Sequence, residues 1–97
     1  MKLTELDPRW QTWHGRSERI EVSFDCPVHG KAHRVRVPFA NPLDGGEPVK
    51  RNHLWQRTGD TFETLTLTPS VDYTKYDNGT VRDPTCWHGF ITNGEIR

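Results

Sequence analysis

The chain has 97 residues, of which 32% are hydrophobic, and its 13 basic residues balance 13 acidic ones. This length allows one small domain with a thin core, and zero net charge excludes a strong general attraction to nucleic acid or anionic lipid. No apolar run approaches the ~18 residues of a membrane helix. The first ten residues also lack the apolar segment of a signal peptide, so a cytoplasmic protein is expected.

Residues 1–19 are predicted to form an N-terminal extension of a single domain that spans residues 1–97. Asp7 and Pro8 are typical of a helix start, with aspartate as the N-cap and proline at the first helical position. In such a turn Trp10 and Trp13 share one face and can dock on the body of the domain. A short N-terminal helical turn is therefore expected.

The next two segments alternate apolar and polar residues with the period of a half-buried strand. The inward positions of segments 20–26 and 33–39 are Ile20, Val22, Phe24, Cys26, His33, Val35, Val37 and Phe39. A turn that contains proline and glycine separates the two segments. The pattern predicts a β-hairpin.

The second half of the chain predicts further strands separated by turn signals. A polar loop rich in glycine and proline is expected over 41–52. Asn78–Gly79 and Asn93–Gly94 are typical of two-residue hairpin turns. The expected strands are 53–59, 62–71 (ended by Pro69) and 86–96, the last of which meets the second turn. The fold class predicted is mostly β, a small antiparallel sandwich or open barrel pinned by one metal.

Both cysteines of the chain have a histidine within three positions. Cys86 and His88 project from the same face of a strand because strand residues two apart point the same way. Cys26 and His29, three apart in a turn, form a common half-site for zinc. We predict one zinc ion held by these four side chains. His33 is the alternate ligand in place of His29, or an outer partner.

Two other interpretations of the cysteines remain open, namely inert buried thiols and a Cys26–Cys86 disulfide. Zinc is favoured because the ligand spacing is short at both ends and a thin core benefits from a staple. A reducing compartment disfavours the disulfide. Four protein ligands leave no position for water, so the predicted zinc is structural.

The order of motifs resembles a family of small bacterial and phage proteins, often prophage-borne. A "CP" turn with a following histidine, "TLTPSV", "C-x-H-x-F" and "NGEI" occur in order between residues 22 and 96. Members share CPxC, PTxSPS and CHxFxxxG-type segments, and some carry an "ammonia monooxygenase" label that a short polar chain does not fit. The resemblance aligns His29 with the second cysteine of CPxC. It implies a phage-linked, zinc-bearing β domain without an assigned reaction.

These features favour a small protein-interaction module over an enzyme. The expected role is a phage accessory or host-takeover protein that binds a host or phage protein, or a minor virion component. The alternative is a metal-dependent or nucleic-acid-directed enzyme, for which the sequence assigns no catalytic residue. Nucleic-acid binding is disfavoured because the net charge is zero. The expected location is the bacterial cytoplasm or the virion.

Overall fold

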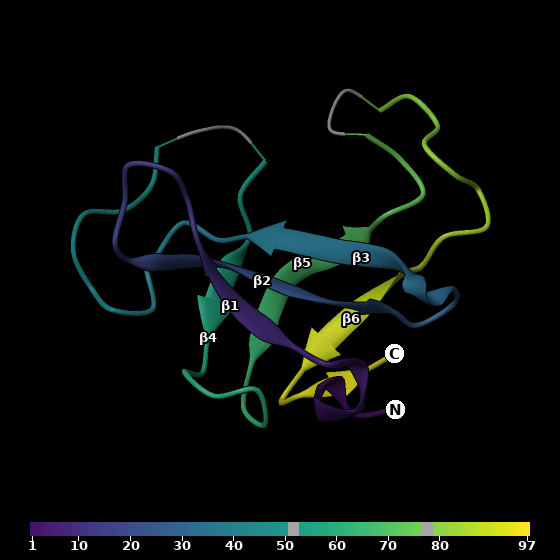
Figure 1. Cartoon of the computed structure of the whole chain (residues 1–97), viewed down its shortest axis with the longest axis horizontal. Coiled ribbons are helices and arrows are strands. Elements are labelled where there is room, and N and C mark those ends of the chain that lie inside the picture. The colour runs from purple at the N-terminus through teal and green to yellow at the C-terminus, as the bar shows by residue number, and fades with distance from the viewer. Residues whose placement is uncertain (51–52, 77–78) are drawn as a thin grey trace.

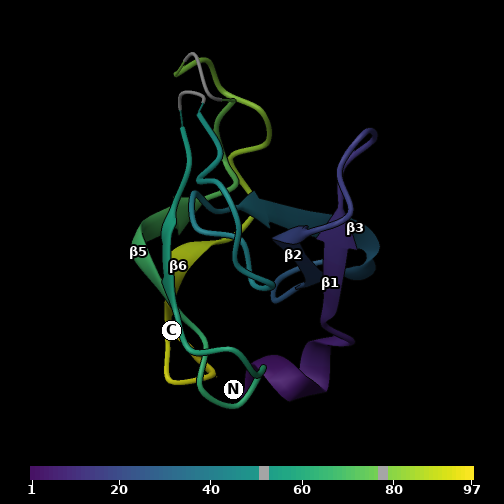
Figure 2. The ribbon, with the colours of Figure 1, turned by 90° about the vertical axis from the view of Figure 1, so that its left-hand side faces the viewer.

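The computed structural model describes residues 1–50, 53–76 and 79–97. A 3-10 turn is followed by seven strands: η1 (Leu3–Leu6), β1 (Arg9–Thr12), β2 (Arg19–Cys26), β3 (Gly30–Pro38), β4 (Gln56–Thr58), β5 (Thr66–Asp72), β6 (His88–Thr92) and β7 (Glu95–Ile96). The strands form two antiparallel sheets, in the orders β1-β2-β3 and β4-β5-β6-β7. Figures 1 and 2 show the sheets facing each other. The predicted mostly-β fold is confirmed.

The hydrophobic core lies between the two sheets. Burial alternates along β6, where Gly89 and Ile91 are buried between exposed residues, whereas β2 is buried at five consecutive positions. Burial of one large apolar side chain stabilises the fold by ~1.5–3 kcal/mol. Trp87, just before β6, packs edge-to-face on Phe24 of β2 with ring centroids 5.8 Å apart. The core includes Val22, Phe24, Val35, Val37, Phe39, Leu65, Leu67, Val71 and Ile91.

The N-terminal segment differs from its prediction. The helical turn η1 lies before Asp7, whose positive φ of 49° ends it, and Pro8 leads into a strand. In β1, Trp10 pairs with Val22 of β2 and stacks on Phe62. The predicted helical turn after Asp7 is wrong because the edge of β2 offers backbone hydrogen bonds along this segment, and sheet pairing outweighs the local helix signal.

Strand β5 continues beyond Pro69, which the sequence predicted to end it. The pairing of β5 with β6 shifts register between Leu67, opposite Ile91, and Val71, opposite Gly89. Pro69 lies in this irregular stretch, where a missing N–H removes no ladder hydrogen bond. The strand therefore extends to Asp72, and the side chains of Ser70 and Asp72 lie on its outer face.

The turn between β6 and β7 agrees with its sequence. Asn93 and Gly94 both have positive φ, 47° and 73°, as a type I′ hairpin turn requires. The other predicted turn includes Asn78, which lies outside the described residues, as do positions 51–52 of the predicted loop. No helix in the described ranges is long and apolar enough to cross a membrane.

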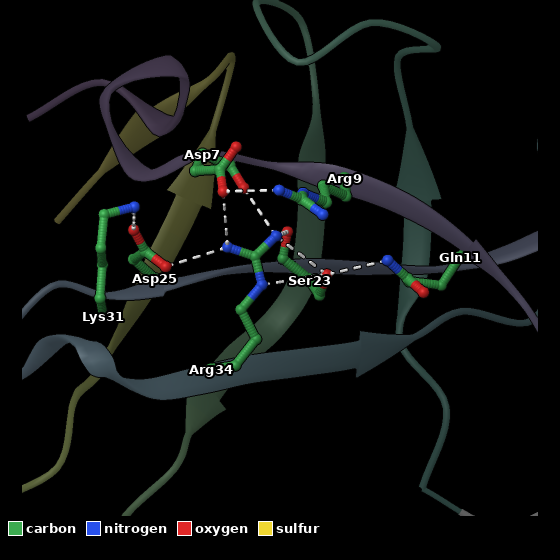
Figure 3. Close-up of polar contacts among 7 residues, drawn as sticks. All are labelled: Asp7, Arg9, Gln11, Ser23, Asp25, Lys31 and Arg34. Carbon is green, nitrogen blue, oxygen red and sulfur yellow. Dashed lines mark hydrogen bonds and ion pairs between the residues drawn. The ribbon is translucent and has the colours of Figure 1, made fainter.

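The outer face of the first sheet is closed by its own polar contacts. Ser23 of β2 is only 1% exposed, because the guanidinium of Arg34 lies over it (Figure 3). Arg34 also donates to Asp25 at 3.0 Å and to the backbone oxygen of Asp7 at 2.6 Å. These polar groups satisfy one another's hydrogen bonds, so we assign them a structural role.

An ion pair at the start of β2 gives a pH-dependent contribution to stability. Hydrogen bonds from Arg19 lower the pKa of Asp44 from 3.8 to about 2. Because the folded pKa is the lower one, the stabilisation is present above pH 3.8 and is lost as the pH falls towards 2. We expect Asp44→Asn to lower the melting temperature at neutral pH but not near pH 2. A difference that persists at the acid end of a melting series would contradict this.

Candidate functional site

A serine, a histidine and an aspartate lie in line on the outer face of the four-stranded sheet. Ser70 and Asp72 are two apart on β5 and share a face, and His88 begins β6 directly opposite Asp72. Ser70 Oγ lies 3.3 Å from His88 Nε2. On the other side of the ring, His88 Nδ1 lies 3.8 Å from Asp72 Oδ2. Hydroxyl, imidazole and carboxylate thus follow one another in the order that activates a serine.

The backbone around these residues is specialised. Ser70 lies within the register shift of β5, between Leu67 and Val71, a feature that re-aims side chains and is common beside active sites. Trp55 Nε1 donates to the backbone oxygen of Ser70 at 3.2 Å. Next to His88, a Cβ at Gly89 would lie 1.9 Å from the Arg97 oxygen and 2.7 Å from Trp87 Nε1. Only glycine permits this close packing behind the histidine.

Thr74 fixes the carboxylate of Asp72. Its backbone N–H donates to Asp72 Oδ1 at 3.0 Å, and its hydroxyl donates to the same oxygen. This leaves Oδ2 for His88. The hydrogen bond from the Thr74 hydroxyl is the main cause that lowers the pKa of Asp72 below its ordinary value. Asp72 is therefore ionised at neutral pH.

The three side chains are open to large substrates. The His88 side chain is 54% exposed, and a hollow of about 280 Å³ beside Ser70 is lined by Trp55, Pro69 and Tyr76, among others. A serine next to a base that is itself next to a carboxylate can attack a carbonyl carbon. The arrangement is suited to acyl transfer from an accessible chain.

A second group of side chains lies where the β2–β3 turn meets the start of β6 (Figure 1). Potential ligand atoms of His29, His33, Asp83 and Cys86 all lie within 4.8 Å of one another and could hold a metal ion. Cys86 Sγ is 3.3 Å from His33 Nδ1 and 3.7 Å from His29 Nδ1. The group joins the first sheet to the segment that leads into His88.

Cys26 belongs beside this group, and Asp83 has other partners. Cys26 Sγ lies 3.8 Å from His29 Nδ1 and accepts from the Val28 N–H at 3.4 Å. Asp83 Oδ1 accepts from the backbone N–H and hydroxyl of Thr85, and that hydroxyl lies 3.1 Å from His29 Nε2. Metal-bound histidines commonly have such an outer carboxylate on their second nitrogen, here reached through a hydroxyl.

The distances fit a tetrahedral ion. A zinc with metal–sulfur bonds of ~2.3 Å and metal–nitrogen bonds of ~2.0–2.1 Å gives sulfur–nitrogen edges of about 3.5 Å. Three of the four sulfur–nitrogen distances among Cys26, His29, His33 and Cys86 are 3.3, 3.7 and 3.8 Å. Both cysteines are free thiols rather than a disulfide. Burial, with the nearby Asp83, raises the pKa of the Cys86 thiol, so a bound cation would have to displace its proton.

The sequence prediction and the structure divide the residues differently. Cys26, His29 and Cys86 come together with the alternate residue His33. His88 lies beside Ser70 and Asp72 instead, on the outer face of the sheet. Ser70 and Asp72 were missed. The available signal was S-x-D, two polar residues that share one face of a strand. It was not used because Pro69 predicted that the strand ends before Ser70.

One comparison with known proteins gives a match. A family model described as bacterial ubiquitination-like system serine protease (BubE) matches residues 3–97. No curated protein and no solved structure matches the chain. A small bacterial family was expected from the motif order, and the match is to a bacterial family. The phage link stays a prediction.

Proposed function

The chain belongs to the family of bacterial ubiquitination-like system serine proteases (BubE), and on that premise we propose that it cleaves polypeptides with Ser70 as the nucleophile. The observation that carries this proposal is the line from Ser70 Oγ through the His88 ring to Asp72. The enzyme takes the place of the phage-linked interaction module favoured by the sequence alone. Its partner is then a protein substrate of the same system.

In the first half-reaction, His88 acts as the general base. With a hydrogen on Nδ1 facing Asp72, Nε2 accepts the Ser70 proton as Oγ attacks the carbonyl carbon. The C–N bond then breaks, and His88 returns the proton to the leaving amine. The product is an acyl ester on Ser70.

Water completes the cycle. It enters beside the exposed His88 ring, which removes a proton as the oxygen attacks the ester. The C–O bond to Ser70 breaks, the serine recovers its proton and the carboxylate product leaves. Asp72 stays ionised throughout and stabilises the imidazolium, which has no other carboxylate among its contacts in the described ranges. At 3.8 Å the contact between His88 Nδ1 and Asp72 Oδ2 is longer than a hydrogen bond, and we expect it to shorten when a substrate binds.

The substrate class that we propose is a protein-linked amide bond of a ubiquitin-like modifier. Two features support it. The family description refers to a ubiquitination-like system, and the triad lies on an open sheet face rather than in a deep pocket. A folded modifier can approach such a face while its C-terminal tail reaches Ser70.

We also propose that the second group binds one structural zinc through Cys26, His29, His33 and Cys86. Two thiolates and two imidazoles are a usual zinc set, and four protein ligands leave no site for catalytic water. Asp83 then acts outside the coordination shell, through Thr85. In this assignment His33 replaces His88 of the set predicted from sequence.

Thr74 is expected to affect turnover without touching the substrate. Thr74→Val removes the hydroxyl bond to Asp72 and should lower kcat/KM about tenfold, the value of one hydrogen bond to a charged group. Thr74→Ser keeps the hydroxyl and should restore most of the activity. Steady-state kinetics of both variants, with kcat and KM separated, provide the measurement. Equal activity of the valine and serine variants would contradict the role.

An inhibition series tests the proposed function against the metal-dependent alternative. Cleavage of internally quenched polypeptides by the parent should stop with a serine-directed sulfonyl fluoride while the zinc stays bound. A chelator should reduce activity only as the circular dichroism spectrum changes. Immediate loss on chelation with an unchanged spectrum would instead favour a metal-dependent enzyme.

A further inference from the structure

Two adjoining hollows extend from Ser70 along one side of the triad. The smaller includes Ser70 itself. The larger, of about 700 Å³, is lined by strand residues of both sheets and by neighbouring loops, and includes Trp13, Arg36 and Arg82. They share His53, Trp55, Asp72, Lys75 and Tyr76. The two hollows therefore adjoin along these five residues, and we call the pair the cleft; Ser70 lines its smaller part.

The anionic groups of this cleft are already paired. Glu21 is buried and accepts from Trp13 Nε1 at 3.3 Å and Arg36 Nη1 at 3.2 Å. Asp72 is held by Thr74 and faces His88. Neither carboxylate is directed at an incoming ligand.

The cationic groups outnumber these anions and face the opening. The Arg36 side chain is 57% exposed and makes one ion pair, and Lys75 is exposed. Arg82 lies over the Tyr73 ring, 4.0 Å from its centroid, which holds its guanidinium at the wall. Three cations against two carboxylates leave the lining with one net positive charge, although Arg36 is itself the partner of Glu21 and the whole chain is neutral. This excess favours a negatively charged ligand.

We propose that the cleft binds an extended acidic segment of the substrate, on one side of the bond cleaved at Ser70. The proposal rests on the proposed peptidase function and adds its specificity: carboxylates of the substrate contact Arg36 and Lys75, and its backbone lies over Trp55 and Tyr76. Aromatic walls bind an extended chain through its apolar surface. The cations favour a segment with negative charge. A polypeptide is favoured over a nucleic acid because the cleft opens directly onto the nucleophile.

Binding to Ser70→Ala protein tests this without turnover. The probes are three fluorescein-labelled peptides of equal length, in which a Gly-Gly pair is flanked by glutamates, glutamines or lysines, and an oligothymidine. Fluorescence anisotropy should give a dissociation constant about tenfold lower for the glutamate than for the glutamine peptide, as expected for a few exposed ion pairs. The lysine peptide should bind most weakly.

Matched variants locate the effect. Arg36→Gln and Lys75→Gln should each weaken glutamate-peptide binding about threefold and leave glutamine-peptide binding unchanged. Glu21 keeps its bond from Trp13 in the first variant. Arg9→Gln is the control. Arg9 is not among the residues that line the cleft, and its side chain is 65% exposed with one ion pair, to Asp7.

Equal affinity for the three peptides would overturn the proposal, and so would an equal effect of Arg9→Gln. Oligothymidine binding that is tighter than the glutamate peptide and sensitive to Arg36→Gln would assign the cleft to nucleic acid instead. Because the protein lacks the serine nucleophile, these results are independent of whether the parent hydrolyses anything. A loss of the proposed peptidase function would appear only in the hydrolysis assays of the parent protein, and not in these binding measurements.

Discussion

Replacing Ser70 with alanine is expected to lower kcat/KM for polypeptide cleavage by ~10⁴–10⁶-fold, the loss seen when a triad nucleophile is removed. The reason is that no other hydroxyl lies beside His88 among the described contacts except that of Ser70. The fold should be unaffected, since Ser70 is on the outer face of β5. Initial rates and a thermal melt of each protein give the comparison.

The control for this prediction is Ser17→Ala, in the exposed connection between β1 and β2, which should retain parental rates. His88→Ala should lose as much activity as Ser70→Ala, and the double variant little more, because members of a triad act as a unit. Additive losses in the double variant would show that the two residues work independently and would contradict the mechanism.

Replacing Cys86 with serine is expected to remove the metal and cooperative folding together. Structural zinc contributes on the order of 10 kcal/mol in small domains, comparable with the ~5–15 kcal/mol total stability of a domain. The site ties the β2–β3 hairpin to the segment before β6, about 60 residues later. Metal analysis of protein purified without chelator, with a melt of the parent and variant, measures both effects.

Two histidine variants identify the fourth ligand. His33→Ala should lose zinc and melt at a much lower temperature, because His33 Nδ1 lies 3.3 Å from Cys86 Sγ. His88→Ala should keep one zinc and a parental melting temperature while it loses activity. The reverse pattern, with zinc lost from the His88 variant alone, would restore the ligand set predicted from sequence.

The strands could be predicted because apolar residues repeat every second position in the sequence. Segments 20–26 and 33–39 overlap β2 and β3, and most of their predicted inward residues belong to the core cluster. His33 does not, and Glu21 and Ser23, predicted to face outward, are also buried under the polar contacts of the sheet. The structure of the N-terminal segment could not be predicted in this way, because β1 forms by pairing with the edge of β2. A local helix signal at Asp7 and Pro8 is weaker than the backbone pairing of β1 with that edge.

The candidate metal centre was visible in the sequence because zinc ligands occur at short spacings. Cys26 with His29 is such a half-site, whereas Cys86 was predicted together with His88, which lies beside Ser70 instead. The choice between His33 and His88 depends on how the hairpin meets β6, which short spacing does not encode. Strand alternation placed His33 on the inward face, and this face is where the structure brings it to Cys86.

The serine, histidine and aspartate could not be found in this way. A triad is defined by geometry and has no fixed order or spacing along a chain. Ser70 and Asp72 follow Pro69, which usually ends a strand, and the register shift that lets β5 continue is a tertiary feature. Ser70 lies within this shifted stretch, and its hydroxyl lies 3.3 Å from the His88 ring.

Covalent labelling with a fluorophosphonate reports whether Ser70 is an activated nucleophile, because the reagent bonds to a serine only when a neighbouring base activates it. Intact mass measurement followed by peptide mapping should find one adduct per chain, located on Ser70. Labelling should be absent from Ser70→Ala and strongly reduced in His88→Ala, while both variants retain the zinc and the fold. A folded parent that gains no adduct, or one labelled at Ser17 or Ser23 to the same extent, would contradict the assignment of Ser70 as the nucleophile.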